Sequence, residues 1–158
     1  MTAAGTWSGR VEAIHVADGR ESPMRAVDSV EAVAGRGLDG DRYYDVAATS
    51  DPPRPDRQVT LVEAEALDGL RRDYGIDLPL GDSRRNITTR GVALNHLVDR
   101  EFTVGGARLR GVKLCEPCEH LERLTGLTLR PGLKHRGGLR CEILAGGILR
   151  VGDLVSPA

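Results

Sequence analysis

Two cysteines stand three residues apart in the segment LCEPCEHLERLTG, residues 114–126. Cys115 and Cys118 could form a redox couple, since a pair at the start of a helix benefits from the positive end of the helix dipole. The acidic neighbours Glu116 and Glu119 oppose that effect, because they disfavour the thiolate. A zinc site is a second interpretation, but the second C-x-x-C or H-x-x-x-H motif that usually completes one is missing.

The third cysteine, Cys141, lies in the strand-like run LRCEIL. A small buried side chain is the interpretation that fits Cys141 best, and it also suits Cys115. Cys118 differs from both, because Pro117 precedes it and stiffens the chain where a helical turn begins. A thiol held in a fixed direction suits a metal ligand or a sulfur acceptor.

Two further segments carry candidate anion or cofactor contacts. Arg84 and Asn86 stand in GDSRRNITTRG, where an arginine offers a planar fork to phosphate and an amide can bond a polar ring edge. Arg136 lies in GLKHRGGLR, whose paired glycines let the backbone approach a ligand. The first segment can also be an ordinary solvated basic turn, and the second can also be an ordinary entry into a hairpin. For each segment, the functional and the structural interpretation both stay open.

The elements that position these residues are short strand-like runs bounded by Gly, Asp or Pro. Many such runs in one chain predict a mostly β fold, either a barrel or a sandwich. The Gly-Gly pairs in FTVGGARLRG and EILAGGILRVGD predict hairpins. Helical periodicity is clear at 63–75, where Gly75 stands as a C-cap, and shorter helices are expected at 92–98 and 118–126. The proline-rich segment 45–57 predicts a mobile surface loop. The predicted strands lie in residues 9–17, 27–35, 57–62, 86–89, 100–114 and 138–155.

Composition sets the broad class. The 158 residues suffice for a single domain, 1–158, with its core at about 7–155. A formal charge of -1 without runs of like charge, and only 3% aromatic residues, argue against nucleic acid or a membrane surface as a partner. Neither a signal-peptide pattern nor an apolar run near 18 residues is present, so a cytoplasmic protein is expected.

Taken together, five segments resemble the MOSC domain, named for the C-terminal region of molybdenum cofactor sulfurases. In order they are GRGLDGDRYY, RQVTLVEAEAL, RRNITTRGVALNHLVDREFTVGGARLRG, CEPCEHL and HRGGLRCEILAGGILRVGDLV, and the resemblance runs from about Trp7 to Val155. It implies a MOSC-type, barrel-like β fold with a few short helices, and a link to the molybdenum cofactor (molybdopterin). By resemblance, Cys118 occupies the position of a molybdenum ligand or sulfur acceptor, and Arg84 with Asn86 matches an Arg-x-Asn feature that holds the pterin.

Some relatives reduce N-hydroxylated bases and amidoximes, so the resemblance implies a molybdenum-dependent oxidoreductase with Cys118 as both catalytic residue and metal ligand. No haem, flavin or iron–sulfur motif is visible, and a separate electron donor is therefore expected. The presence of Cys115 keeps a second hypothesis open, a non-catalytic sulfur or cofactor carrier that holds a persulfide and works with a sulfur-transfer protein. A third hypothesis is a fold with structural cysteines and no cofactor.

Overall fold

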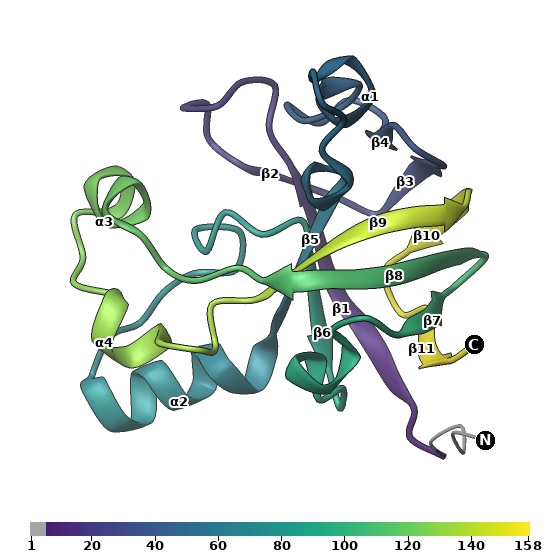
Figure 1. Cartoon of the computed structure of the whole chain (residues 1–158). Coiled ribbons are helices and arrows are strands. Elements are labelled where there is room, and N and C mark those ends of the chain that lie inside the picture. The colour runs from purple at the N-terminus through teal and green to yellow at the C-terminus, as the bar shows by residue number, and fades with distance from the viewer. Residues whose placement is uncertain (1–5) are drawn as a thin grey trace.

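A closed barrel of seven strands forms the centre of the computed structural model, which describes residues 6–158 (Figure 1). Hydrogen bonding follows the order β11-β7-β8-β9-β5-β6-β1, and pairing between β11 and β1 closes the barrel. Among these seven described strands, β5 pairs with β6 in parallel and the other neighbouring strands pair antiparallel. The strands are β1 (Gly9–Val16), β5 (Val59–Glu63), β6 (Ile87–Arg90), β7 (Glu101–Val104), β8 (Ala107–Leu114), β9 (Leu139–Ala145) and β11 (Leu154–Pro157). The prediction of a mostly β, barrel-like fold is confirmed.

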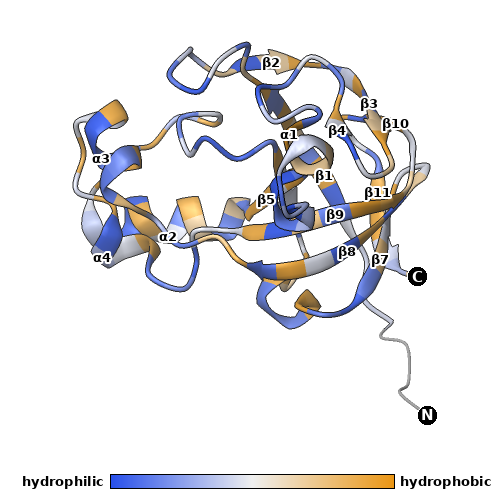
Figure 2. Cartoon of the chain, turned by 45° about the horizontal axis from the view of Figure 1, so that its top comes forward, coloured by the Kyte–Doolittle hydropathy of each residue, from blue (hydrophilic) through white to orange (hydrophobic). Residues whose placement is uncertain are grey.

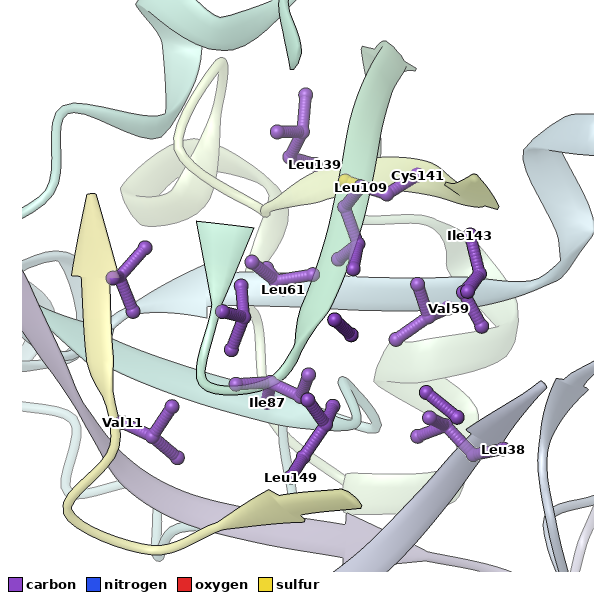
Figure 3. Packing of buried hydrophobic residues seen from close by; sticks show 14 of the residues in the cluster. Val11, Leu38, Val59, Leu61, Ile87, Leu109, Leu139, Cys141, Ile143 and Leu149 are labelled. Carbon is purple, nitrogen blue, oxygen red and sulfur yellow. The ribbon is translucent and has the colours of Figure 1, made fainter. Parts of the chain in front are cut away.

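Alternation along the barrel strands explains why they close around an apolar interior. In β8 and β9 buried and more exposed residues alternate, and Figure 2 shows the matching change between hydrophobic and hydrophilic colours. Successive side chains of a strand point to opposite faces, so one set enters the barrel. Leu61, Ile87 and Leu109 lie within this interior with no exposed surface (Figure 3). Each fully buried leucine or isoleucine stabilises the fold by about 1.5–3 kcal/mol.

One predicted hairpin is confirmed and the other is wrong. Gly105 and Gly106 join β7 to β8, with Val104 paired to Ala107. By contrast, β9 pairs with β8 and β5, whereas β10 (Gly147–Arg150) pairs with β3 (Ser29–Val33) in a small second sheet that also holds β4 (Gly37–Leu38). A Cβ on Gly146 would lie 2.5 Å from the Ala32 carbonyl oxygen, so this glycine permits a close approach between segments instead of making a tight turn.

Three helices lie together on one side of the barrel (Figure 1). They are α2 (Ala64–Tyr74), α3 (Glu119–Thr125) and α4 (Arg130–Leu133). The predicted C-cap is confirmed, since Gly75 ends α2 in the left-handed conformation at φ 65°. An apolar cluster separate from the barrel interior packs the helices together and includes Leu70, Leu121 and Leu133. The chain at 92–98 forms a single 3-10 turn, η2 (Leu94–Leu97).

The remaining elements are short. β2 (Arg25–Val27) pairs with β1 outside the barrel. The segment 45–57, expected to lack regular structure, contains α1 (Val46–Thr49) and the 3-10 turn η1 (Pro55–Arg57). Asp56 holds this segment in an ordered conformation, because its side chain is buried and forms ion pairs with Arg54 and Lys113, each at 3.3 Å. Across residues 6–158 no helix is long and apolar enough to cross a bilayer.

Candidate functional site

The two neighbouring cysteines lie on the loop that joins the end of β8 to α3. The backbone N–H of Cys115 donates to the Gly138 carbonyl at 2.7 Å, which fixes the loop beside the start of β9. Cys118 is the N-cap residue of α3, and its carbonyl accepts from Glu122 at 3.1 Å. Cys118 is exposed, whereas Cys115 is 4% exposed. Of the two thiols, that of Cys118 is the one presented to a ligand.

Both cysteines line a cavity of about 160 Å³ that we call the arginine cavity. Six arginines line it, against a single acidic residue, Glu116. That carboxylate is itself bound to His135. The excess of positive charge in a partly enclosed space favours an anion. The arginines are Arg20, Arg42, Arg57, Arg84, Arg85 and Arg140.

Two of these arginines hold the wall in place. Arg85 is 8% exposed and donates to the carbonyls of Gly137 at 2.7 Å, Cys115 at 3.2 Å and Glu116 at 3.4 Å. It therefore fastens the cysteine loop to the residues that precede β9. The side chain of Arg42 is 6% exposed and pairs with Asp41 at 3.0 Å.

Other arginines keep donors available to a ligand. Within residues 6–158, neither Arg57 nor Arg140 forms an ion pair or a side-chain hydrogen bond, and the Nε atoms of Arg57 and Arg42 are buried without a partner. Among the described residues, the guanidiniums of Arg57 and Arg140 therefore keep donors that no protein acceptor takes up, and both arginines line the cavity. The cavity wall thus combines an exposed thiol with unsatisfied cationic donors.

Arg84 lines the same cavity as Cys118. Its guanidinium donates to the carbonyl of Ser22 and, at 2.6 Å, to that of Arg20. Burial, and next the neighbouring Arg42, lower the pKa of Arg84. Arg84 itself adopts the left-handed conformation at φ 66°. Its side chain therefore anchors the 20–22 loop while it contributes charge to the wall.

Asn86 and Arg136 lie apart from the arginine cavity. Asn86 has no exposed surface and stands directly before β6, and its amide bonds to two other strands: Oδ1 accepts from the Thr60 N–H at 3.1 Å, and Nδ2 donates to the His15 carbonyl at 3.1 Å. Arg136 is exposed and lies over α2, where a Cβ on Gly69 would be 2.9 Å from its Nη1. Neither residue lines the cavity that holds Cys118.

Sequence reasoning missed Arg42, Arg57 and Arg140 as members of the site. Arg57 lay in the segment expected to be a surface loop, and Arg42 in GRGLDGDRYY, a run used only for its resemblance to the MOSC domain. For Arg140 a signal existed: it precedes Cys141, which is fully buried in β9, so alternation directs Arg140 away from the barrel interior.

Cys141 is a core residue, in agreement with its interpretation from sequence. It has no exposed surface and lies among the apolar side chains of the barrel (Figure 3). Burial strongly raises the pKa of the Cys141 thiol, so this group stays protonated and unreactive.

Comparisons with known proteins agree with this architecture. The family model for the MOSC domain matches residues 15–156. Among solved structures, the YuaD protein from Bacillus subtilis superimposes with a TM-score of 0.78 at 17% identity, covering 94% of each chain. YiiM from Geobacillus stearothermophilus gives a TM-score of 0.73 at 14% identity, over 95% of this chain and 75% of that chain.

YiiM from Escherichia coli gives a TM-score of 0.68 at 16% identity, over 94% of this chain and 69% of that chain. A comparison with curated proteins found no match.

Proposed function

The chain belongs to the MOSC domain family, and from that premise we propose that it binds the molybdenum cofactor and reduces N-hydroxylated compounds, with Cys118 as the metal ligand. One observation carries the proposal: the exposed thiol of Cys118 lines the same cavity as six arginines. A thiolate is a soft ligand suited to a transition metal, and arginine forks suit a phosphate.

The residues of the cavity fit such a group. The molybdenum cofactor carries a phosphate, and the guanidiniums of Arg57 and Arg140, which form no ion pair within residues 6–158, supply hydrogen bonds of the kind a phosphate accepts. A cavity of about 160 Å³ is smaller than the roughly 300 Å³ at the lower end for drug-sized ligands, so it admits the phosphate and metal end of a cofactor but not a whole pterin. A second cavity of about 290 Å³ also borders Arg84 and offers room beside it.

In this proposal the residues of the chain bind and orient. Arg57 and Arg140 hold the phosphate, and Arg85 keeps the cysteine loop at a fixed distance from them. Asn86 acts from behind the wall, by joining β6 to β1 and β5. When bound, the metal supplies the two-electron removal of oxygen from an N–O bond. A separate electron-donor protein is part of the proposal.

A sulfur carrier is the second candidate, favoured by the presence of two thiols in one cavity. There Cys118 would hold a persulfide and Cys115 would lie behind it, 4% exposed. This function needs no turnover of an organic substrate.

The test is elemental analysis for molybdenum and zinc on protein from a host that makes the cofactor. We expect near-stoichiometric molybdenum in the unchanged chain and none in Cys118→Ser. Arg57→Gln should retain less, whereas Arg100→Gln, at an exposed arginine outside the cavity wall, should match the unchanged protein. Absence of molybdenum from the unchanged chain, or its full retention in Cys118→Ser, contradicts the proposal. Reduction of benzamidoxime with an artificial donor then tests the reaction.

A further inference from the structure

We propose that the arginine cavity is also a thiosulfate site, and that Cys118 takes the outer sulfur of thiosulfate to form a persulfide. This would be a thiosulfate sulfurtransferase activity that requires no molybdenum. It goes beyond the reductase proposed above and gives the sulfur-carrier alternative a chemically defined donor.

Charge is the first argument. Thiosulfate is a dianion whose sulfonate end presents three acceptor oxygens, and a concave group of guanidiniums recognises that shape through charge-assisted hydrogen bonds. Arg57 and Arg140 have no ion-pair partner within residues 6–158, and Arg42 keeps a buried Nε without an acceptor although its side chain is 6% exposed. Arg42, Arg57 and Arg140 line one cavity although they come from segments distant in the chain.

Size and access are the second argument. The cavity, at about 160 Å³, is below the roughly 300 Å³ typical of the smallest sites for drug-sized ligands, so a small inorganic anion is a better match to it than an organic acid. Its wall contains an exposed thiol, that of Cys118, whereas Cys115 is buried. An anion held by the arginines therefore lies in the same small space as a nucleophilic sulfur.

The chemistry balances without an added oxidant or reductant. The Cys118 thiol first loses its proton to solvent, because the thiolate is the nucleophile. The thiolate Sγ then attacks the outer sulfur of thiosulfate; a bond forms between these two sulfurs, and the sulfur–sulfur bond of thiosulfate breaks. Sulfite leaves with the electron pair of that bond, and Cys118 keeps a persulfide. The guanidiniums stabilise the doubly charged sulfite as it separates.

The experiment uses the full-length chain from a host that cannot make the molybdenum cofactor, incubated with sodium thiosulfate at constant ionic strength. We expect a mass increase of one sulfur atom on Cys118, release of one equivalent of sulfite, and conversion of the persulfide to thiocyanate when cyanide is added. Cys118→Ser should lose all three signals, and Arg100→Gln, at an exposed arginine outside the cavity wall, should keep them. Because the protein lacks molybdenum, this result is independent of the reductase test.

Arginine variants separate recognition by the cavity from simple thiol reactivity. Arg57→Gln and Arg140→Gln should each raise the thiosulfate concentration for half-maximal reaction roughly tenfold, the loss expected for one charge-assisted hydrogen bond. Arg100→Gln should leave it unchanged, and sodium sulfate should compete in the unchanged protein where sodium chloride does not. Absence of the persulfide on Cys118 overturns the proposal. The proposal also fails if Arg57→Gln and Arg140→Gln react at the same thiosulfate concentrations as the unchanged protein. It fails as well if sulfate does not compete with thiosulfate, a test that uses the unchanged protein alone.

Discussion

Glu116 binds His135 through both oxygens of its carboxylate: Oε1 accepts the His135 backbone N–H at 2.7 Å, and Oε2 lies 2.7 Å from the ring Nδ1. Glu116 stands between the two cysteines, and His135 lies just after α4. The pair therefore joins the cysteine loop to the segment that leads into β9. Arg85 joins the same two segments a second time, by donating to the carbonyls of Gly137 and Cys115.

The substitution Glu116→Gln tests the first of these connections. Partial burial by itself raises the pKa of Glu116, but the hydrogen bonds from His135 outweigh it and lower that pKa below its ordinary value of 4.5. The contribution to stability is thus complete above pH 4.5 and is lost as the pH falls through the lower, folded-state pKa. Because the pair is largely exposed, we expect the variant to lose only about 0.5–1 kcal/mol of unfolding free energy at pH 7.

Urea unfolding of the unchanged protein and the variant at several pH values measures this difference. The two curves should converge in acid. A difference in stability that persists well below pH 4 would show that the carboxylate is not its source.

The substitution Arg85→Lys tests the second connection. A lysine cannot reproduce three hydrogen bonds from one planar group to Gly137, Cys115 and Glu116. Arg85 is 8% exposed, so water cannot replace the hydrogen bonds that these carbonyls lose in the variant. We therefore expect the free energy of unfolding to fall by about 2–4 kcal/mol. Chemical denaturation measures it, with Arg100→Lys at an exposed position as the control. A loss no larger than that of the control would contradict the assigned role.

Gly137 tests how tightly the cysteine loop packs. A Cβ at this position would collide with the Cys115 carbonyl oxygen and lie 2.8 Å from Cδ of Pro117. Gly137→Ala should therefore destabilise the protein by about 1–3 kcal/mol. It should also change the rate at which a disulfide reagent modifies Cys118. Gly106→Ala is the matched control, since its Cβ would meet nothing nearer than 3.8 Å; equal effects of the two variants would refute the packing argument.

Selective alkylation tests the difference between the thiols. Iodoacetamide should modify Cys118 in the folded protein at least about tenfold faster than Cys141, because Cys141 has no exposed surface and burial raises the pKa of its thiol. Peptide mass spectrometry over a time course measures the rates. In urea all three cysteines should react, which serves as the control. Early modification of Cys141 in the folded chain would place it outside the core.

His15 gives a prediction about stability in mild acid. Burial lowers the pKa of His15 from its ordinary value of 6.5, and the nearby Asp82 offsets this only in part. The unfolded chain therefore binds a proton near pH 6.5 that the folded chain does not, so stability falls as the pH drops from 6.5 to the lower folded-state pKa. The slope from one such group is at most about 1.4 kcal/mol per pH unit.

Unfolding free energies at pH 7.5, 6.5 and 5.5 measure that slope. His15→Gln should have a shallower slope over this range than the unchanged protein, and Arg100→Gln, at an exposed position, should keep the original one. Parallel slopes in all three proteins would assign the effect to other groups.

Local signals determined much of the fold. Short strand-like runs bounded by Gly, Asp or Pro predicted the barrel strands, Gly75 marked the end of α2, and Gly105 with Gly106 marked a hairpin, since each signal depends on neighbours a few residues away. The Gly-Gly pair at 146–147 misled because the same letters serve a tight turn or a close approach, and only the position of Ala32 in space distinguishes the two.

The candidate site was likewise determined in part by local sequence and in part by tertiary structure. Local sequence indicated a directed thiol at Cys118, which the structure exposes, and it singled out Arg84, which lies in the same cavity. Barrel closure alone brings Arg42, Arg57 and Arg140 around that thiol, because they come from separate loops and strands whose pairing joins distant segments. It also decides that the amide of Asn86 is committed to Thr60 and His15, since a hydrogen-bond partner far along the chain leaves no trace in the local sequence.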